Sequence, residues 1–540
     1  MRSLAWRVGL VLSVAALGCQ GQVAAPSGTR GDPGARCDPN SQEVGSVPLR
    51  RLSRMEFQNA VRDLLYGTTV VDAPVIPADV SEHGFENVAA QLSAPRLLVE
   101  RYELTATELA EAAMADVTTR DRIVGCVSGA TPSECTEAFL DGFGRRAFRR
   151  PMTDDERADF RAFIEDVAIR IDFDAAIELA VSAMIQSPQF TYRLERGVDG
   201  VASPFEMASR LSFFLWQSIP DDALLDAAAA GELATPGEVE MQARRMLDDP
   251  RARAAAIDFH RQWLDFDRVT REPKNAEMFP DWSEDLRAAI REESDRFVGD
   301  VVWDGDPTLA TLLTSRATYV NADLAAHYGV APVGEWTRVE LPEGERSGIL
   351  TRAGFLAGRS HETNGSPVLR GAFVIDRMLC RELGSPPDDA DTSPVVPPAG
   401  TGPRTNRQLF EERTGSMVCQ GCHRQIDGIG YGFEHYDSTG AYRDLDQGLP
   451  VDATGNLVAT DVDGPYDGAV EISERLAQSE TVRSCVARSW VRYTLGRATT
   501  GEDACFVQRA EDSLRATGGD LRELMVTIVT SPQFARGLMP

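Results

Sequence analysis

The sequence contains a single lysine, Lys274, in 540 residues, so arginine carries nearly all of its positive charge. The 55 Lys+Arg residues are outnumbered by 83 Asp+Glu residues, and the formal net charge is −28. A nucleic-acid-binding protein needs a basic face that neutralises phosphates, and binding to anionic lipid needs clustered cations. The composition therefore argues against a nucleic-acid partner and against a polylysine contact with a membrane.

Several motifs of common enzyme classes are also missing. There is no Gly-rich phosphate loop and no Gly-x-Ser-x-Gly elbow, and the aspartates between Asp444 and Asp467 do not follow the EF-hand order. The six histidines form no HxH or HExxH pair. Glu434 and Asp437 resemble acid–base partners, but the nearby Arg443 favours a local ion-pair network. No catalytic residue is assigned.

The chain has one marked hydrophobic run, at its N-terminus, and this run is short. Val8 to Leu17 follows Arg2 and Arg7, and a membrane-spanning helix needs about 20 apolar residues. The run leads through Ala15-Ala16-Leu17-Gly18 into Cys19, as in a bacterial lipobox. We expect a signal peptide at 1–18 and lipid attachment at Cys19. An ordinary secretory signal, with Cys19 incidental, is the alternative.

The lipobox predicts a location in the bacterial cell envelope, with the lipid anchor contacting the membrane. Gln20 follows the cysteine, which by known sorting rules favours the outer membrane, facing the periplasm or the cell surface. Disulfides persist in this oxidising compartment. Of the eight remaining cysteines, Cys126 with Cys135 and Cys485 with Cys505 are predicted to form local disulfides, although sequence does not fix connectivity.

Helical periodicity dominates the chain. Leu98, Tyr102, Leu109 and Ala113 share one helical face, and Ser53 to Glu56 fits a capping box. Strand patterns are short, around 318–320 and 336–341, with a turn-rich stretch at 441–465. We therefore predict a mainly α, multi-domain helical protein with short β-hairpin or turn-rich insertions and a duplicated helical module.

Composition shifts and motifs divide the chain into seven segments. The expected divisions are a signal peptide (1–18), a lipidated cysteine and flexible tether (19–46), an N-terminal helical domain (47–120), a first helical module (121–195), a central helical domain (196–332), a CxxCH-containing domain (333–450) with a Pro-rich linker (385–404), and a second helical module (451–540).

The two modules share an ordered set of features, which indicates a duplication. Each has a cysteine, a Gly-Arg pair, a Thr-capped helix start and an apolar helix that ends in Ser-Pro-Gln-Phe, at 187–190 and 531–534. The proline ends the helix, so Phe190 or Phe534 is expected to fold back as a hydrophobic plug.

One segment could carry chemistry. Cys419-Gln420-Gly421-Cys422-His423 is the attachment pattern of a c-type haem. Two thiols three positions apart on a helical turn reach the two vinyl groups of one porphyrin, and His423 then offers its imidazole to the iron as proximal ligand. Met378, His435 and His361 are the candidates for the distal ligand. Met417 is not among them, because it is too close to the attachment turn to reach the far face of the haem.

Two other interpretations compete with haem. Cys419 and Cys422 could form a tight disulfide, or they could bind zinc with His435 and Cys380 in a Cys₃His site. Haem or the disulfide leaves six cysteines for three bridges, whereas zinc leaves an odd number, which counts mildly against it.

The chain also resembles a family of exported multi-domain proteins of unknown function from planctomycetes and myxobacteria, in which cytochrome-c-like modules often occur. The resemblance covers nearly the whole mature chain. It is carried by Arg51 to Phe57, Gly84 to Asn87, Phe143 to Pro151, Leu211 to Trp216, Phe259 to Leu264, Asn321 to Gly329, Ser366 to Gly371 and the CxxCH segment.

The resemblance implies a domain architecture and suggests a bound haem, but it does not imply a particular reaction. The first hypothesis is a lipoprotein with one covalent haem c that acts in envelope electron transfer, with a redox partner protein, or in a haem-dependent oxidation. The second is a non-catalytic envelope scaffold or binding protein, in which the CxxC pair is a structural disulfide or part of a zinc site.

Overall fold

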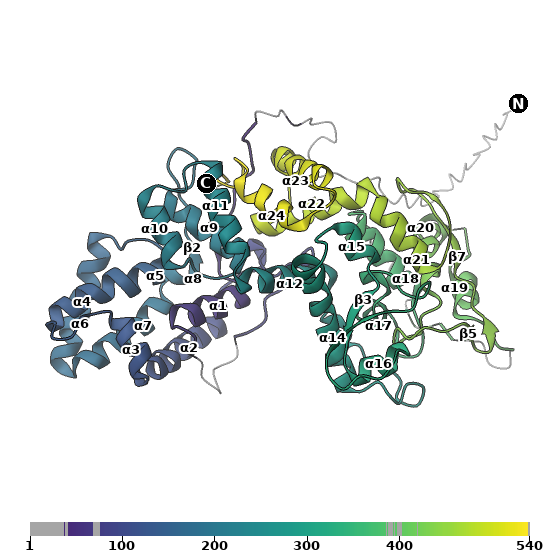
Figure 1. Ribbon diagram of the computed structural model, residues 1–540, viewed down its shortest axis with the longest axis horizontal. Coiled ribbons are helices and arrows are strands. Elements are labelled where there is room, and N and C mark those ends of the chain that lie inside the picture. Colours follow the sequence, from purple (N-terminus) through teal and green to yellow (C-terminus); the bar gives the residue numbers. More distant parts are fainter. Residues whose placement is uncertain are drawn as a thin grey trace, which may run out of the picture.

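The computed structural model describes residues 37, 41–68, 76–384, 386, 393, 395–396, 402–417 and 419–537. The expected signal peptide and Cys19 lie outside these residues. Most described residues lie in helices, which confirms the mainly α prediction. The helices form two lobes joined near their upper edge (Figure 1). Among the described residues, no helix is both long enough and apolar enough to cross a membrane.

The N-terminal lobe, purple to blue in Figure 1, contains an apolar core of its own between Leu52 and Ile219, and the buried residues from Leu224 to Leu247 belong to a second, larger core. Strands β1 and β2 pair antiparallel, with Arg50 opposite Arg193, so the start of the lobe is joined to residues far along the chain. Its elements are β1 (Arg50–Arg51), α1 (Arg54–Leu64), η1 (Ala89–Gln91), α2 (Arg96–Ala115), α3 (Val117–Val124), α4 (Pro132–Phe139), η2 (Leu140–Gly144), α5 (Arg145–Phe148), α6 (Asp154–Arg170), α7 (Phe173–Gln186), α8 (Pro188–Thr191), β2 (Tyr192–Arg193), α9 (Pro204–Trp216), α10 (Asp222–Ala230) and α11 (Pro236–Leu247).

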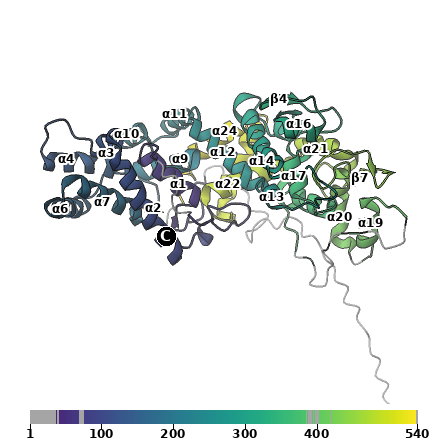
Figure 2. The ribbon, with the colours of Figure 1, turned by 90° about the horizontal axis from the view of Figure 1, so that it is seen from below.

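The second lobe, teal to green, begins beyond α12, which runs between the lobes in both views (Figures 1 and 2). The expected strands near 318 and 337 are confirmed as the hairpin β3–β4. The helix between the lobes is α12 (Pro250–Leu264). The second lobe contains α13 (Arg268–Arg271), α14 (Glu284–Gly299), η3 (Asp300–Asp304), α15 (Leu309–Thr314), β3 (Ala317–Val320), α16 (Ala322–Tyr328), β4 (Thr337–Glu340), η4 (Ile349–Thr351), α17 (Ala353–Gly358), α18 (Pro367–Phe373), η5 (Val374–Met378), α19 (Asn406–Thr414), α20 (Gln420–Gly430), η6 (Tyr431–Phe433), β5 (Leu445–Asp446), β6 (Leu449–Pro450), β7 (Thr454–Leu457), β8 (Gly464–Asp467) and α21 (Gly468–Gln478).

The last helices, yellow in Figure 1, lie between the two lobes. They are α22 (Glu480–Leu495), η7 (Gly501–Asp503), α23 (Ala504–Ala516) and α24 (Leu521–Thr530). Trp490 of α22 stacks on Phe259 of α12 at a ring-centroid distance of 3.7 Å. These helices belong to the same apolar core as α9, α11, α12 and α20, so the C-terminal module closes the main core.

Local sequence signals account for many helix boundaries. Ser53, Thr153, Ser203 and Thr235 each accept a hydrogen bond from the backbone N–H three residues ahead, and the Glu at that position bonds back to the cap. Proline occupies the first helical position of α4, α8, α9, α11 and α12, where its missing N–H costs no hydrogen bond.

The two Ser-Pro-Gln-Phe segments share a serine cap, although the first forms the short helix α8 and the second forms a turn. Ser187 and Ser531 accept hydrogen bonds from the N–H groups of Phe190 and Phe534, and both phenylalanines are buried as predicted. In the first copy the guanidinium of Arg149 donates to the carbonyls of Gln189, Phe190 and Tyr192. In the second, Arg210 of α9 donates to the carbonyls of Phe534, Arg536 and Gly537. A buried arginine therefore holds each turn in place.

Three disulfides join the six cysteines of the described chain other than Cys419 and Cys422. The predicted Cys126–Cys135 bridge is confirmed. The predicted Cys485–Cys505 bridge is wrong, because Cys485 pairs with Cys380 and Cys505 pairs with Cys37. Cys485 and Cys505 lie on α22 and α23, and each helix directs its cysteine toward a different neighbour. Nearness in sequence was therefore a poor guide to this pairing.

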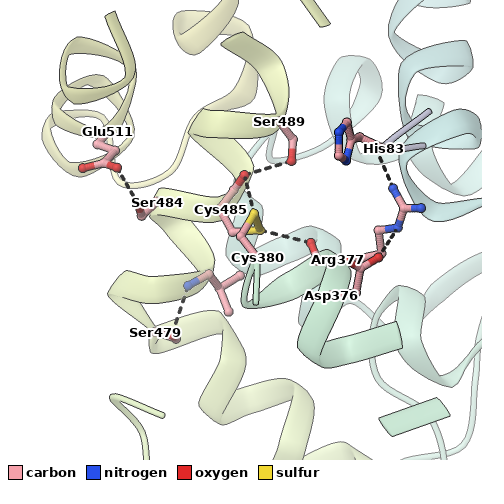
Figure 3. Close-up of a disulfide and its surroundings, with 10 residues drawn as sticks. His83, Asp376, Arg377, Cys380, Ser479, Ser484, Cys485, Ser489 and Glu511 are labelled. Atoms are coloured by element: carbon pink, nitrogen blue, oxygen red, sulfur yellow. Dashed lines mark hydrogen bonds and ion pairs between the residues drawn. A yellow bond between two sulfur atoms is a disulfide. The ribbon is translucent and has the colours of Figure 1, made fainter. Parts of the chain in front are cut away.

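The Cys380–Cys485 bridge ties the segment after η5 to α22 (Figure 3). Arg377, beside it, donates to the carbonyl of His83 at 2.7 Å. The guanidinium thereby connects this region of the main core to the loop that precedes η1.

The Cys37–Cys505 bridge joins Cys37 to α23 of the C-terminal module. The segment 41–47 follows the same surface. Gly45 donates its N–H to Asp503 at 3.0 Å, and Arg497 donates to the carbonyls of Gly45 and Ser46. Part of the segment 19–46, expected to be a flexible tether, is therefore an ordered strap on the C-terminal module.

Candidate functional site

The CxxCH segment opens α20, and α20 is fixed by unusually close packing against α18. A Cβ atom at Gly371 would lie 2.0 Å from the carbonyl oxygen of Ile426, and one at Gly430 would lie 2.0 Å from that of Pro367. Real Cβ atoms do not approach backbone oxygens this closely, so only glycine fits at either position. The two helices therefore touch backbone to backbone.

Arg370, next to Gly371 on α18, holds the chain that follows α20. Its guanidinium is fully buried and donates to the carbonyls of Leu356, Phe433, Tyr436 and Asp437, at 2.8–3.2 Å. Burial lowers the pKa of Arg370 to about 10, so the group stays charged at neutral pH. One side chain thus connects α17, α18 and the turn after η6.

The two cysteines of the motif lie at the start of α20, and both are free thiols. Cys419 directly precedes the helix and is half-buried, whereas Cys422 is exposed. The hydroxyl of Ser416 donates to the sulfur of Cys419 at 3.1 Å and accepts from the N–H of Cys419 at 3.3 Å. The side-chain amide of Gln420 donates to the carbonyl of Thr414 at 3.0 Å, so the first turn is fastened to the end of α19.

His423 is oriented by a buried carboxylate one turn along the helix. Its Nδ1 lies 3.0 Å from Oδ1 of Asp427, and the hydroxyl of Thr414 donates to Oδ2 of Asp427 at 2.7 Å. Since an ionised carboxylate only accepts hydrogen bonds, Nδ1 carries the hydrogen and the lone pair remains on Nε2. A histidine that donates one nitrogen to a carboxylate and offers the other is a typical metal ligand.

The cysteines named in the two alternatives to haem have the following arrangement. Cys380 is used in a disulfide with Cys485, so the zinc set of Cys380, Cys419, Cys422 and His435 does not form. Cys419 and Cys422 are not bonded to each other. Within the described ranges, no group of three or more His, Cys, Asp and Glu side chains is arranged to hold a metal ion.

The three distal-ligand candidates lie in different environments. Met378 is fully buried in the main core. His435 stacks on Tyr442, and its Nδ1 lies 2.9 Å from the carbonyl of Arg443. His361 lines a cavity of about 620 Å³, where burial and the charge of Lys274 lower its pKa. Met417 is almost fully exposed.

The side chains that resembled an acid–base pair have structural partners. Glu434 accepts from the amide of Asn406 at 3.0 Å with both oxygens, and burial raises its pKa. Asp437 accepts from the backbone of Thr439 and Ala441 and so closes a turn. Arg443 pairs with Asp446 at 2.6 Å, which agrees with a local ion-pair network.

Asp427 and Arg370 are the site residues that sequence reasoning missed. A carboxylate four residues after His423 lies on the same helical face, so the spacing i, i+4 could have identified Asp427. Arg370 stands out in the sequence only as part of the Ser366 to Gly371 motif. The fold brings its carbonyl partners to it from other parts of the chain, and no fixed sequence spacing identifies such partners.

Comparison with protein families gives five matches in tandem. Each model is described as a protein of unknown function: DUF1587 over residues 50–115, DUF1595 over 135–195, DUF1592 over 202–330, DUF1588 over 346–446 and DUF1585 over 464–534. The chain belongs to the family that carries these five domains. Searches of curated proteins and of solved structures give no match.

This family assignment confirms the resemblance seen in the sequence. The five domains are of unknown function and are associated with cytochrome c families. The DUF1588 match contains α18, α19, α20 and the whole CxxCH turn. The residues matched by DUF1588 therefore include both the CxxCH segment and the helix against which α20 is packed.

Replacing Gly371 by Ala tests the backbone contact between α18 and α20. The added Cβ would overlap the carbonyl of Ile426, so we expect the free energy of unfolding to fall by roughly 1–3 kcal/mol or more, measured as a lower Tm by calorimetry. Gly237→Ala is the matched control, because Gly237 also lies in a helix and a Cβ there meets nothing within 4 Å. Equal Tm values for the two variants would contradict the close contact.

The tautomer of His423 tests its contact with Asp427. In haem-free, reduced protein, long-range ¹H–¹⁵N spectra should report the Nδ1–H form, with His423→Ala supplying the assignment. Asp427→Asn removes the anionic acceptor and should raise the population of the Nε2–H form. Asp444→Asn is the control, because exposed Asp444 lies beside His435 instead. If His423 has the same tautomer in Asp427→Asn as in the wild type, the carboxylate does not determine the tautomer.

Proposed function

We propose that the chain binds one haem c covalently through Cys419 and Cys422, with His423 as the proximal ligand, and that it acts in envelope electron transfer or in a haem-dependent oxidation. The observation that carries this proposal is the first turn of α20. Two free thiols and an imidazole with its Nδ1 tied to Asp427 occur together there. Membership of a cytochrome-c-associated family supports the same conclusion.

The residues present fit the attachment half of such a site. A thioether needs a reduced cysteine, and neither thiol is used elsewhere. Axial ligation needs a free imidazole nitrogen, and the bond to Asp427 leaves Nε2 free. When bound, the haem would supply a redox-active iron whose potential depends on burial and on the axial ligands.

This chain's own residues would then tune the site. Asp427 would increase the basicity of the His423 imidazole, because its carboxylate accepts the Nδ1 hydrogen. Gly371, Gly430 and Arg370 would keep α20 in place. We propose no distal ligand. His361 and His435 are partly exposed, Met378 is buried in the main core, and none of the three is singled out by its position.

The proposal includes export and anchoring. The lipobox at Cys19 supports a lipoprotein on the outer membrane, with a redox partner in the envelope. The three disulfides agree with an oxidising compartment.

Expression of the mature chain in a host with haem-c maturation tests the attachment. We expect the purified protein to keep haem after denaturation, seen as peroxidase staining in a denaturing gel and as a pyridine haemochrome spectrum. Cys422→Ala should abolish double thioether attachment, and His423→Ala should reduce the yield of attached haem.

His435→Ala is the matched control, because the His423 and His435 side chains are almost equally exposed, at 25% and 23%. It should leave covalent attachment unchanged. A colourless wild-type product from a competent host would overturn the haem proposal and favour a non-catalytic scaffold or binding protein.

A further inference from the structure

A small cavity lies where the N-terminal lobe meets the C-terminal module. Its volume is about 30 Å³, roughly the volume that one water molecule occupies in the liquid. Strands β1 and β2, helices α9 and α22 and the segment after α24 all contribute to its wall. The charged residues that line it are Arg50, Arg193, Glu195, Arg210 and Arg536. Its wall therefore carries four guanidinium groups and one carboxylate.

The fold brings three of these arginines together away from water. Arg50 and Arg193 are directly opposite each other in the antiparallel pairing of β1 with β2, and like charges in that position repel. The side chains of Arg50, Arg193 and Arg210 are only 4%, 10% and 6% exposed. Because solvent screens buried charges poorly, their repulsion has to be offset by negative charge nearby.

Two carboxylates lie among these arginines. Glu56 pairs with Arg50 at 2.9 Å, and Glu195 pairs with Arg193 at 2.5 Å and with Arg210 at 2.7 Å. Burial opposes the ionisation of Glu195, but the charges of Arg193 and Arg210 outweigh it and lower its pKa to about 2. Glu195 is therefore fully ionised at neutral pH, and its charge is already shared between two guanidinium groups.

The positive charge of the cluster exceeds its negative charge. Arg149 belongs to the same cluster, since the guanidinium groups of Arg149 and Arg193 lie 5.5 and 5.6 Å from the ring centroid of Phe213. Burial and the charge of Arg193 lower the pKa of Arg149 to about 9. Within the described ranges, neither Arg149 nor Arg536 forms an ion pair with a carboxylate. Five arginines therefore share two carboxylates, and uncompensated buried charge is costly.

N–H groups at the cavity remain unused. Arg193 donates to Glu195 through Nε and Nη2, and its Nη1 makes no hydrogen bond in the described chain. Arg536 donates through Nε to the side chain of Gln42 at 3.1 Å, and its two Nη atoms make none in that part of the chain. Charged donors are therefore available to a ligand on two sides of the cavity.

The size and the charge of the cavity restrict its occupant. The arginines would repel a cation, and a sulfate, phosphate or organic anion has several heavy atoms and exceeds the volume. Water fits, and it could donate to the side-chain oxygens of Asn87 and Gln533, which have no partner in the described chain. Water is neutral, however, and leaves the buried charge uncompensated. A monatomic anion fits the volume and also offsets the charge.

We infer that this cavity binds one chloride-sized inorganic anion. The anion would accept hydrogen bonds from Arg193 and Arg536 and would offset the charge of Arg50 and Arg210. It would thereby join the N-terminal lobe to the C-terminal module. The inference does not depend on haem, because α20 lies in the other lobe (Figures 1 and 2).

Bromide locates the site directly, because it resembles chloride and gives an anomalous X-ray signal. Crystals of the full mature chain grown with sodium bromide should show an anomalous peak inside the cavity, within hydrogen-bonding distance of Arg193 or Arg536. Peaks on the outer surface alone, or a cavity that holds only water, would overturn the inference.

Thermal unfolding tests the effect in solution. Sodium chloride and sodium gluconate are compared at equal ionic strength, because gluconate is too large for the cavity. We expect Tm to be higher in chloride by on the order of 1 °C or more, and to rise with the logarithm of the chloride concentration, since a ligand that binds only the folded chain stabilises it. Equal Tm values in the two salts would contradict the site.

A variant ties the chloride effect to the cavity. Arg536→Gln removes one lining guanidinium that is half-buried and forms no ion pair in the described chain, so the variant should fold, which its Tm in gluconate checks. Its rise of Tm in chloride should shrink or disappear. Arg96→Gln is the matched control, because it removes the same charge from a side chain that is 92% exposed and lies outside the cavity. If Arg536→Gln keeps the full chloride effect, or if both variants lose it equally, the inference is wrong.

Discussion

The close contact between α18 and α20 is the constraint on which the candidate site depends. Gly371 and Gly430 allow the two backbones to touch, and Arg370 then binds four carbonyls around the end of α20. These contacts are buried and lie in the second half of α20, at Ile426 and Gly430. The first turn, with Cys419 and Cys422, extends from this frame, and its links to the rest of the chain are the bond from Gln420 to Thr414 and the contact of His423 with Asp427.

The near absence of lysine has a structural counterpart. Arg149, Arg210 and Arg370 are each buried and each donate to three or more backbone carbonyls. A guanidinium has five donors in a planar fork and can satisfy several carbonyls at once, whereas an ammonium is a compact point charge. Lys274 is also partly buried, and burial lowers its pKa to about 8. Arginine therefore suits a fold that fastens its turns through main-chain oxygens.

Sequence alone predicted the local features well, because caps, helix-starting prolines and apolar periodicity act over a few residues. Ser53, the Ser-Pro-Gln-Phe turns and the hairpin near 318 and 337 were all identified in this way. The partner of Cys485 was not, since Cys380 is brought to it only by the packing of η5 on α22. The strap at 41–47 was also missed, because its Gly- and Ser-containing sequence indicates flexibility while Arg497 and Asp503 hold it from far along the chain.

The most direct measurement of the central claim is mass spectrometry of the tryptic peptide from Thr414 to Arg424, taken from protein matured in its natural compartment. This peptide contains Cys419, Cys422 and His423 and no other cysteine. The account predicts that it carries one haem bound to both cysteines. Recovery of the peptide with two unmodified thiols, or with a Cys419–Cys422 disulfide, would contradict it.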